Sequence, residues 1–161
     1  MGDETVKGAA AGTVGVWVMD VVTWFLYRRQ SKVTIAKEKK ARKFGQDPAH
    51  AGARHLAKLA GSGAARSEPN AGGIFIHYLL GIGPGMVYAR LRRANPAVTV
   101  GKGAVWGAGL YLANDLVAGR LLRIMGPQRD YPWQAHARGI VGHVVLGVTT
   151  HAVLAALDDA S

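Results

Sequence analysis

The stretch DYPWQAHARGIVGHVVLGVTTHAVLAAL, residues 130–157, decides the fold of this 161-residue chain. It begins with a turn of proline and aromatic residues, and residues 139–157 contain no Asp, Glu, Lys or Arg. A helix rises 1.5 Å per residue, so an uncharged run of this length is long enough to cross the hydrocarbon core of a bilayer. The stretch therefore predicts a transmembrane helix over residues 137–157.

Three other segments have the same design, apolar and rich in glycine. Residues 8–27 contain one charged side chain, Asp20; residues 69–89 contain none; residues 103–119 contain only Asp115. An amphipathic helix of a soluble bundle carries charges along its wet face, and these segments have no such face. The pattern favours an all-α polytopic membrane protein over a soluble four-helix bundle. We predict a single membrane domain, residues 1–161, with four transmembrane helices in a bundle at about 8–27, 71–89, 103–125 and 137–157.

Residues 28–70 differ sharply from these spans, because they form a basic loop in which we expect short surface helices. Asp47 and Pro48 predict the N-cap and first residue of one helix, which ends before Gly61. His50 and His55 lie on it, and their separation of five residues is poor for a shared metal, so both are expected to be solvated. The basic side chains expected to contact anionic lipid headgroups are Arg28, Arg29, Lys37, Lys39, Lys40, Arg42 and Lys43.

The distribution of basic residues predicts the topology. Four spans place the 90–102 loop and both termini on one side, with five of the 20 Lys and Arg residues: Lys7, Arg90, Arg92, Arg93 and Lys102. The other fifteen lie on the side of the long loop, which is therefore predicted to be cytoplasmic, with both termini on the non-cytoplasmic side of a bacterial inner membrane. Basic residues beside spans also account for the net charge of +10, so the expected partner is a lipid bilayer and not nucleic acid.

Ionisable side chains inside the spans are the main functional lead. Measured from the predicted span ends, Asp20, His77, Asp115 and His143 all lie about 9–12 Å into the cytoplasmic half of the membrane. Such groups are costly in lipid unless they face a partner or water. His151 follows His143 by eight residues, on one broad stripe of the fourth helix.

These residues leave several functions open. Imidazole and carboxylate groups in hydrogen-bond reach favour a proton or cation relay through Asp20, His77, Asp115, His143 and His151. The same Asp20, His77, Asp115 and His143 are a possible ligand set for zinc, manganese or iron. A haem held between His77 and His143 is a third interpretation. Alternatively, the groups are structural hydrogen bonds between helices.

An accessory or assembly subunit of a larger membrane complex, or a homo-oligomer, is the rival interpretation from another class. The small residues Gly8, Gly12 and Gly15 of the first span, together with the basic loop, would be its docking surfaces. The chain contains no HExxH, no GxSxG and no phosphate-binding loop, so an enzyme is less expected. It also has no cysteine, which excludes disulfides and thiolate metal sites.

The second half of the chain resembles a known family. The residues that carry the resemblance are His77, the loop ANPAVTVGKG, the segment GPQRDYPW with Asp130, Pro132 and Trp133, and the pair Gly142 and His143. In these features the chain is similar to the YagU-like family of small bacterial inner-membrane proteins. The resemblance implies a polytopic inner-membrane protein of largely undetermined biochemistry, with a loose link to acid tolerance. The long basic loop of the first half has no clear counterpart in that pattern.

Overall fold

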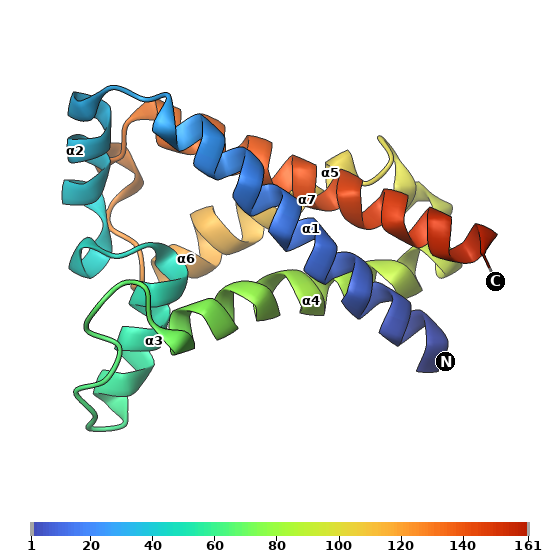
Figure 1. The fold of residues 1–161 in the computed structure, drawn as a ribbon, viewed down its shortest axis with the longest axis horizontal. Helices are drawn as coiled ribbons and strands as arrows, with labels where there is room; N and C mark the ends of the chain where they lie inside the picture. The colour runs from blue at the N-terminus through green and yellow to red at the C-terminus, as the bar shows by residue number, and fades with distance from the viewer. Residues whose placement is uncertain (1, 161) are drawn as a thin grey trace.

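A computed structural model describes residues 2–160, and every regular element in that range is helical (Figure 1). Three helices are long and apolar enough to cross a membrane: α1 (Gly2–Arg28), α4 (Ala71–Ala94) and α7 (Trp133–Asp159). They correspond to the first, second and fourth predicted spans, so the prediction of an all-helical chain with apolar membrane-length helices is confirmed for them. Large apolar side chains remain exposed along them, including Trp17, Trp24 and Phe75, as expected of faces that lie in lipid.

The third predicted span, residues 103–125, is not one regular α-helix. It consists of α5 (Ala104–Tyr111), the π-helix η3 (Leu112–Ala118) and the short α6 (Gly119–Leu121). The N–H of Gly119 donates to the Asn114 carbonyl, which gives the wider π turn. The helical run ends at Leu121 because the N–H groups of Ile124 and Met125 both donate to the carbonyl of Gly119 and fold the chain back.

The first long helix is held against the second by glycine. Gly8 and Gly12 of α1 meet Gly85 and Gly81 of α4, and a Cβ added at Gly12 would lie 2.6 Å from the Gly81 carbonyl oxygen. The predicted small-residue face of the first span is therefore confirmed, and it is occupied within the chain. Residues of α4 cover Gly8 and Gly12, and residues of α7 cover Gly15. These three glycines are therefore not available as a docking surface for another protein.

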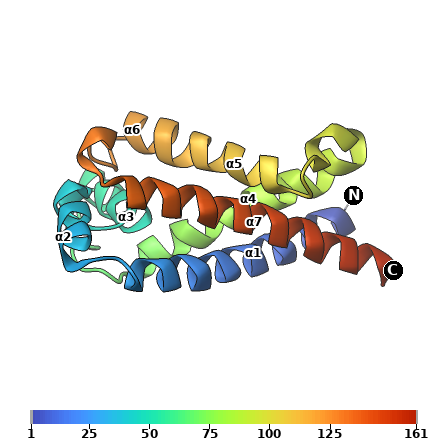
Figure 2. The ribbon, with the colours of Figure 1, turned by 90° about the horizontal axis from the view of Figure 1, so that it is seen from above.

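The last helix lies between α1 and the broken third segment. Figure 2 shows α7 running along α5 and α6 on one side and along α1 on the other. Gly142 packs against Thr23 of α1, and Gly107 of α5 packs against the backbone at His143. The short helices η2 (Pro96–Thr99) and η4 (Gln128–Asp130) lie in the connections before and after the third segment.

The basic loop folds into helices at the end of the bundle opposite the two termini (Figure 1). These are α2 (Lys32–Ala41), η1 (Lys43–Gly45) and α3 (Pro48–Leu59). Asp47 caps α3 by accepting the N–H of His50, so the predicted start of this helix is confirmed. The helix is not solvated as expected, because residues 49–53 are buried and α3 packs against α4.

Candidate functional site

A cavity opens where α1 and α4 separate. The two helices cross near the end of the bundle that carries the termini, and they diverge toward α2 and α3 (Figure 1). The cavity has a volume of about 450 Å³ and is lined by α1, α3, α4, η3 and α7. All four residues predicted to meet at one level, Asp20, His77, Asp115 and His143, line it.

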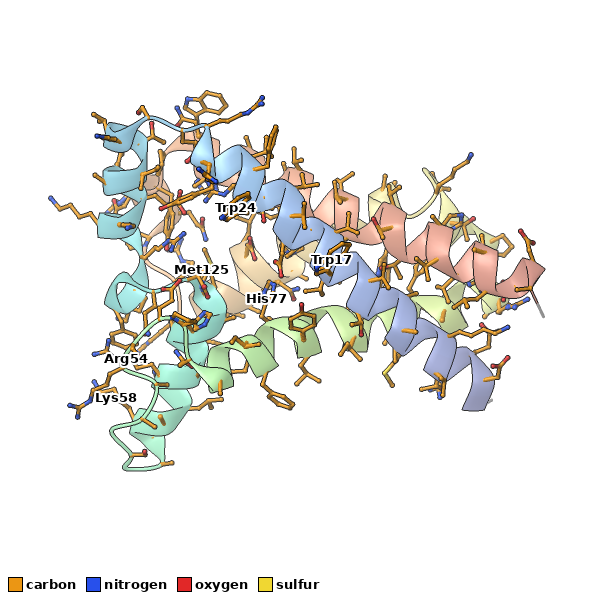
Figure 3. The ribbon with its side chains drawn as sticks, viewed as in Figure 1. Trp17, Trp24, Arg54, Lys58, His77 and Met125 are labelled. Atoms are coloured by element: carbon orange, nitrogen blue, oxygen red, sulfur yellow. The ribbon has the colours of Figure 1, made fainter. Side chains whose placement is uncertain are left out.

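The first Asp–His pair joins α1 to α4 across this cavity. His77 Nε2 donates a hydrogen bond to Asp20 Oδ1 over 2.8 Å, and Figure 3 shows His77 directed from α4 into the space beside α1. The side chains retain 30% and 42% of their exposed surface, so both remain accessible from the cavity. The pair is therefore part of the cavity wall and is not enclosed by packed side chains.

The second pair joins the π-helix to α7. His143 Nδ1 donates to the Gly139 carbonyl over 2.9 Å, which leaves Nε2 facing Asp115 Oδ1 at 4.0 Å. Because the Nδ1 hydrogen is held by the backbone carbonyl, Nε2 is the ring nitrogen that faces the carboxylate. Gly139 makes room for this arrangement, since a Cβ there would lie 2.7 Å from the Tyr111 ring and 3.4 Å from Asp115 Oδ2.

A third pair, Asp47 and His50, was not predicted from the sequence. His50 is only 8% exposed, so the expectation that it is solvated is wrong. Its Nδ1 lies 2.7 Å from Asp47 Oδ2, both residues line the cavity, and its Nε2 is buried without a hydrogen-bond partner. The signal in the sequence was the run of small residues at 49–53, which lets α3 approach Gly73 so closely that a Cβ there would lie 2.8 Å from His50 Cα.

Apart from the Tyr78 phenol, the ionisable side chains of the described cavity lining are carboxylates and imidazoles. Three carboxylates and three imidazoles face it, and among the described residues no Lys or Arg lines it. Thr23, Tyr78 and Asn114 add uncharged polar groups. The lining therefore combines groups that accept and release protons with neutral hydrogen-bonding groups.

Carboxylates at the loop-side rim of the cavity have perturbed acidities. Burial raises the pKa of Asp47, but hydrogen bonds and the charge of His50 outweigh burial and hold that pKa below its usual value. Burial, and then the nearby Asp47 carboxylate, raise the pKa of Glu68. The two carboxyl groups lie close together, with one oxygen of each within 4.8 Å of the other.

Two histidines of α7 lie outside the cavity. His151, predicted as a relay residue, is 2.8 Å from the Tyr88 hydroxyl through Nδ1 and does not line the cavity. His136 Nε2 donates to the Gln128 carbonyl, and its Nδ1 accepts from the Tyr111 hydroxyl. Both ring nitrogens of His136 are hydrogen-bonded, so this side chain links α7 to the neighbouring segments. The stripe of histidines on this helix therefore does not form one continuous path.

The predicted metal set does not form a compact ligand group. Asp20, His77, Asp115 and His143 surround the cavity, but over the described residues three ligand atoms come within 4.8 Å of one another only at Asp47, His50 and Glu68. The two histidines proposed to hold a haem have Nε2 directed at Asp20 and Asp115. The cavity thus presents separate Asp–His pairs.

The basic loop presents most of the predicted headgroup ligands to the surface, with one exception. Arg28, Arg29, Lys37, Lys39, Lys40 and Lys43 are exposed.

Arg42 is the exception, because it pairs with the buried Glu38 at 2.8 Å. Glu38 is 2% exposed and also pairs with Arg138 of α7 at 2.6 Å. Burial raises the pKa of Glu38, but the hydrogen bonds and charges of Arg138 and Arg42 outweigh it and lower that pKa. Arg42 is therefore engaged inside the protein, where it and Arg138 of α7 share the Glu38 carboxylate; its contact with lipid stays a prediction.

Comparisons with known proteins add no assignment: no family model, no curated protein and no solved structure matches the chain. The similarity to the YagU-like family stays a prediction from the motif residues.

Proposed function

We propose that this chain is a small four-span protein of the bacterial inner membrane that takes up and passes protons through its cavity. Asp20 with His77 and Asp115 with His143 are the proposed proton carriers. The observation that carries the proposal is the gathering of three Asp–His pairs around one cavity whose described lining has no Lys or Arg. In this proposal α5, η3 and α6 together form the third span.

The chemistry of the pairs suits proton transfer. Imidazole is the side chain whose ordinary pKa lies closest to neutral pH, and a neighbouring carboxylate offers the proton a second acceptor. Intramembrane carboxylates and histidines that face a cavity are typical of proton pathways. The gap of 4.0 Å between His143 Nε2 and Asp115 Oδ1 is a distance that one water molecule or a small side-chain movement closes.

The count of basic residues supports the proposed topology, with fifteen on the side of the long loop and five on the side of the termini. Arg92 and Arg93 count against external termini, and both form ion pairs within the chain. Asp158 lies 2.6 Å from Arg92 and 2.8 Å from Arg93, and Glu4 lies 3.0 Å from Arg93. The larger number of basic residues on the loop side is the reason that we place the long loop in the cytoplasm.

The rival interpretation, an accessory subunit with structural polar groups, has less support. One of its two docking surfaces was the glycine face of the first span, and those glycines pack inside the chain. The basic loop, its other surface, keeps most of its basic side chains exposed. Hydrogen bonds that only fix helix register need no cavity, whereas both members of the Asp20–His77 pair remain accessible. This accessibility favours the proton function.

Proton flux into liposomes tests the proposal. The purified full chain, reconstituted with a pH-sensitive dye inside, should acidify the interior under an imposed gradient faster than protein-free liposomes. Asp20→Asn and His143→Gln should each return the rate to the protein-free level. His55→Gln, on α3 outside the cavity lining, should leave the rate unchanged. A wild-type rate equal to that of empty liposomes, or equal rates in all four proteins, would refute the proposal.

A further inference from the structure

We propose that Asp47, His50 and Glu68 hold a divalent transition-metal ion, of the zinc or manganese class, at the loop-side rim of the cavity. One ligand atom from each of the three lies within 4.8 Å of the other two. None of these residues is a proposed proton carrier. The inference concerns a second site and stands independently of the proton function.

The three side chains are held in place before any ion binds. Asp47 and His50 lie at the start of α3 with 2.7 Å between Oδ2 and Nδ1. Glu68 precedes α4, and its Oε2 accepts the Asp47 N–H over 3.1 Å. Gln46 fixes the same segment, because its Nε2 donates to the Ser67 carbonyl over 2.9 Å. Small side-chain movements therefore bring the three ligands to metal-binding distances.

The electrostatics of the cluster favour a cation. Two carboxylates approach each other here, and the nearest guanidinium, Arg42, is 3.9 Å from Glu68 and is bonded chiefly to Glu38 at 2.8 Å. The charge of the Asp47 carboxylate raises the pKa of Glu68 and so disfavours its charged form. A divalent ion between them would remove this repulsion and become the largest local charge.

The imidazole of His50 is the buried ligand of the cluster. Its side chain is 10% exposed, and its Nδ1 already faces Asp47 Oδ2 at 2.7 Å. A metal ion bound at Nδ1 would take the place of the hydrogen now shared with Asp47 and leave the ring hydrogen on Nε2, which has no hydrogen-bond partner in this structure. His50 also lines the cavity, so the same ring borders both sites.

The donor set selects the class of ion. One nitrogen and two carboxylate oxygens suit zinc, manganese or ferrous iron, with water in the remaining positions. A site of this kind has no soft sulfur ligand for copper(I), and the imidazole disfavours calcium.

Metal titration of the full-length protein in detergent tests the inference. Metal-free protein is titrated with Co²⁺, followed by visible absorption, and with Zn²⁺, followed by calorimetry. We expect one ion per chain, and at least about tenfold weaker binding in Asp47→Asn and Glu68→Gln. Asn is as good an N-cap as Asp, so Asp47→Asn keeps α3, and Glu68 lies in an exposed loop, so both variants should fold. His55→Gln on the same helix should bind as the wild type does.

Three outcomes would overturn the inference. Wild-type protein that gives neither a cobalt spectrum nor calorimetric heat has no such site. Unchanged binding in both Asp47→Asn and Glu68→Gln would mean an adventitious ion only. Loss of binding in His77→Gln, with Asp47→Asn unaffected, would move the ion to the cavity interior. None of these results depends on whether the protein conducts protons, which the liposome assay measures separately.

Discussion

The two ends of the bundle differ in how α1 and α4 meet. Near the termini the helices touch backbone to backbone, through Gly8 with Gly85 and Gly12 with Gly81. Toward the loop the same helices carry Asp20 and His77, which meet only through a hydrogen bond across the cavity. Glycine thus brings the helices together at one end, and their crossing angle opens the space that polar side chains fill at the other.

Breaking the glycine contact should have the largest effect. A side chain at position 81 would collide with Val16, whereas a Cβ at Gly83 meets nothing within 4 Å. Gly81→Leu should lower the free energy of unfolding by about 3 kcal/mol or more, because the α1 and α4 backbones must separate. Thermal unfolding in detergent measures it, with Gly83→Leu as the matched control on the same helix. Equal losses in the two variants would contradict the glycine-contact explanation.

The loop end depends on a buried ion cluster. Glu38 pairs with Arg42 and Arg138, which fastens α2 to α7. Glu38→Gln leaves two guanidinium groups with a neutral partner, and the stability should fall by about 3 kcal/mol, the lower range for breaking a buried pair. Lys39→Gln, a neighbouring exposed residue, should change it by less than about 0.5 kcal/mol. Equal stability of these two variants would show that α2 is not held by this cluster.

Acid should weaken the same contact reversibly and to a smaller extent. The pKa of Glu38 is lowered in the folded protein, so its contribution to stability is complete above the unfolded-state pKa and is lost as the pH falls through the folded value. The difference in melting temperature between wild type and Glu38→Gln should be constant from about pH 5 to 7 and should shrink below about pH 4. A difference that already shrinks between pH 7 and 5 would contradict a lowered pKa of Glu38 in the folded protein.

Removing the charge of Asp20, which pairs with His77 in the cavity, should lower the stability least. Asp20→Asn retains an acceptor for His77 Nε2 and removes only the charge, so the free energy of unfolding should fall by about 1 kcal/mol. The same variant should lose proton flux completely. Thermal unfolding measured beside the liposome assay separates a local chemical role from general destabilisation. A loss of stability as large as that of Gly81→Leu would assign Asp20 a mainly structural role.

The sequence by itself determined the helical class, the three long apolar helices, the glycine face of α1 and the Asp47 cap of α3. These properties depend on run length, on spacing along one helix and on local hydrogen bonds, all of which can be read from neighbouring residues. It also predicted that Asp20, His77, Asp115 and His143 lie at one level along the bundle, and all four line one cavity.

Only the tertiary structure decided which way those side chains point. Rotation about a helix axis depends on the partner helices, so the convergence of the pairs on one cavity and the separation of His151 could not be read from spacing. The π turn that carries Asp115, the burial of His50 against Gly73 and the capture of Arg42 by Glu38 have the same origin. Each depends on contacts between segments far apart in the chain, where packing and pairing of charges outweigh the local preference of the residue.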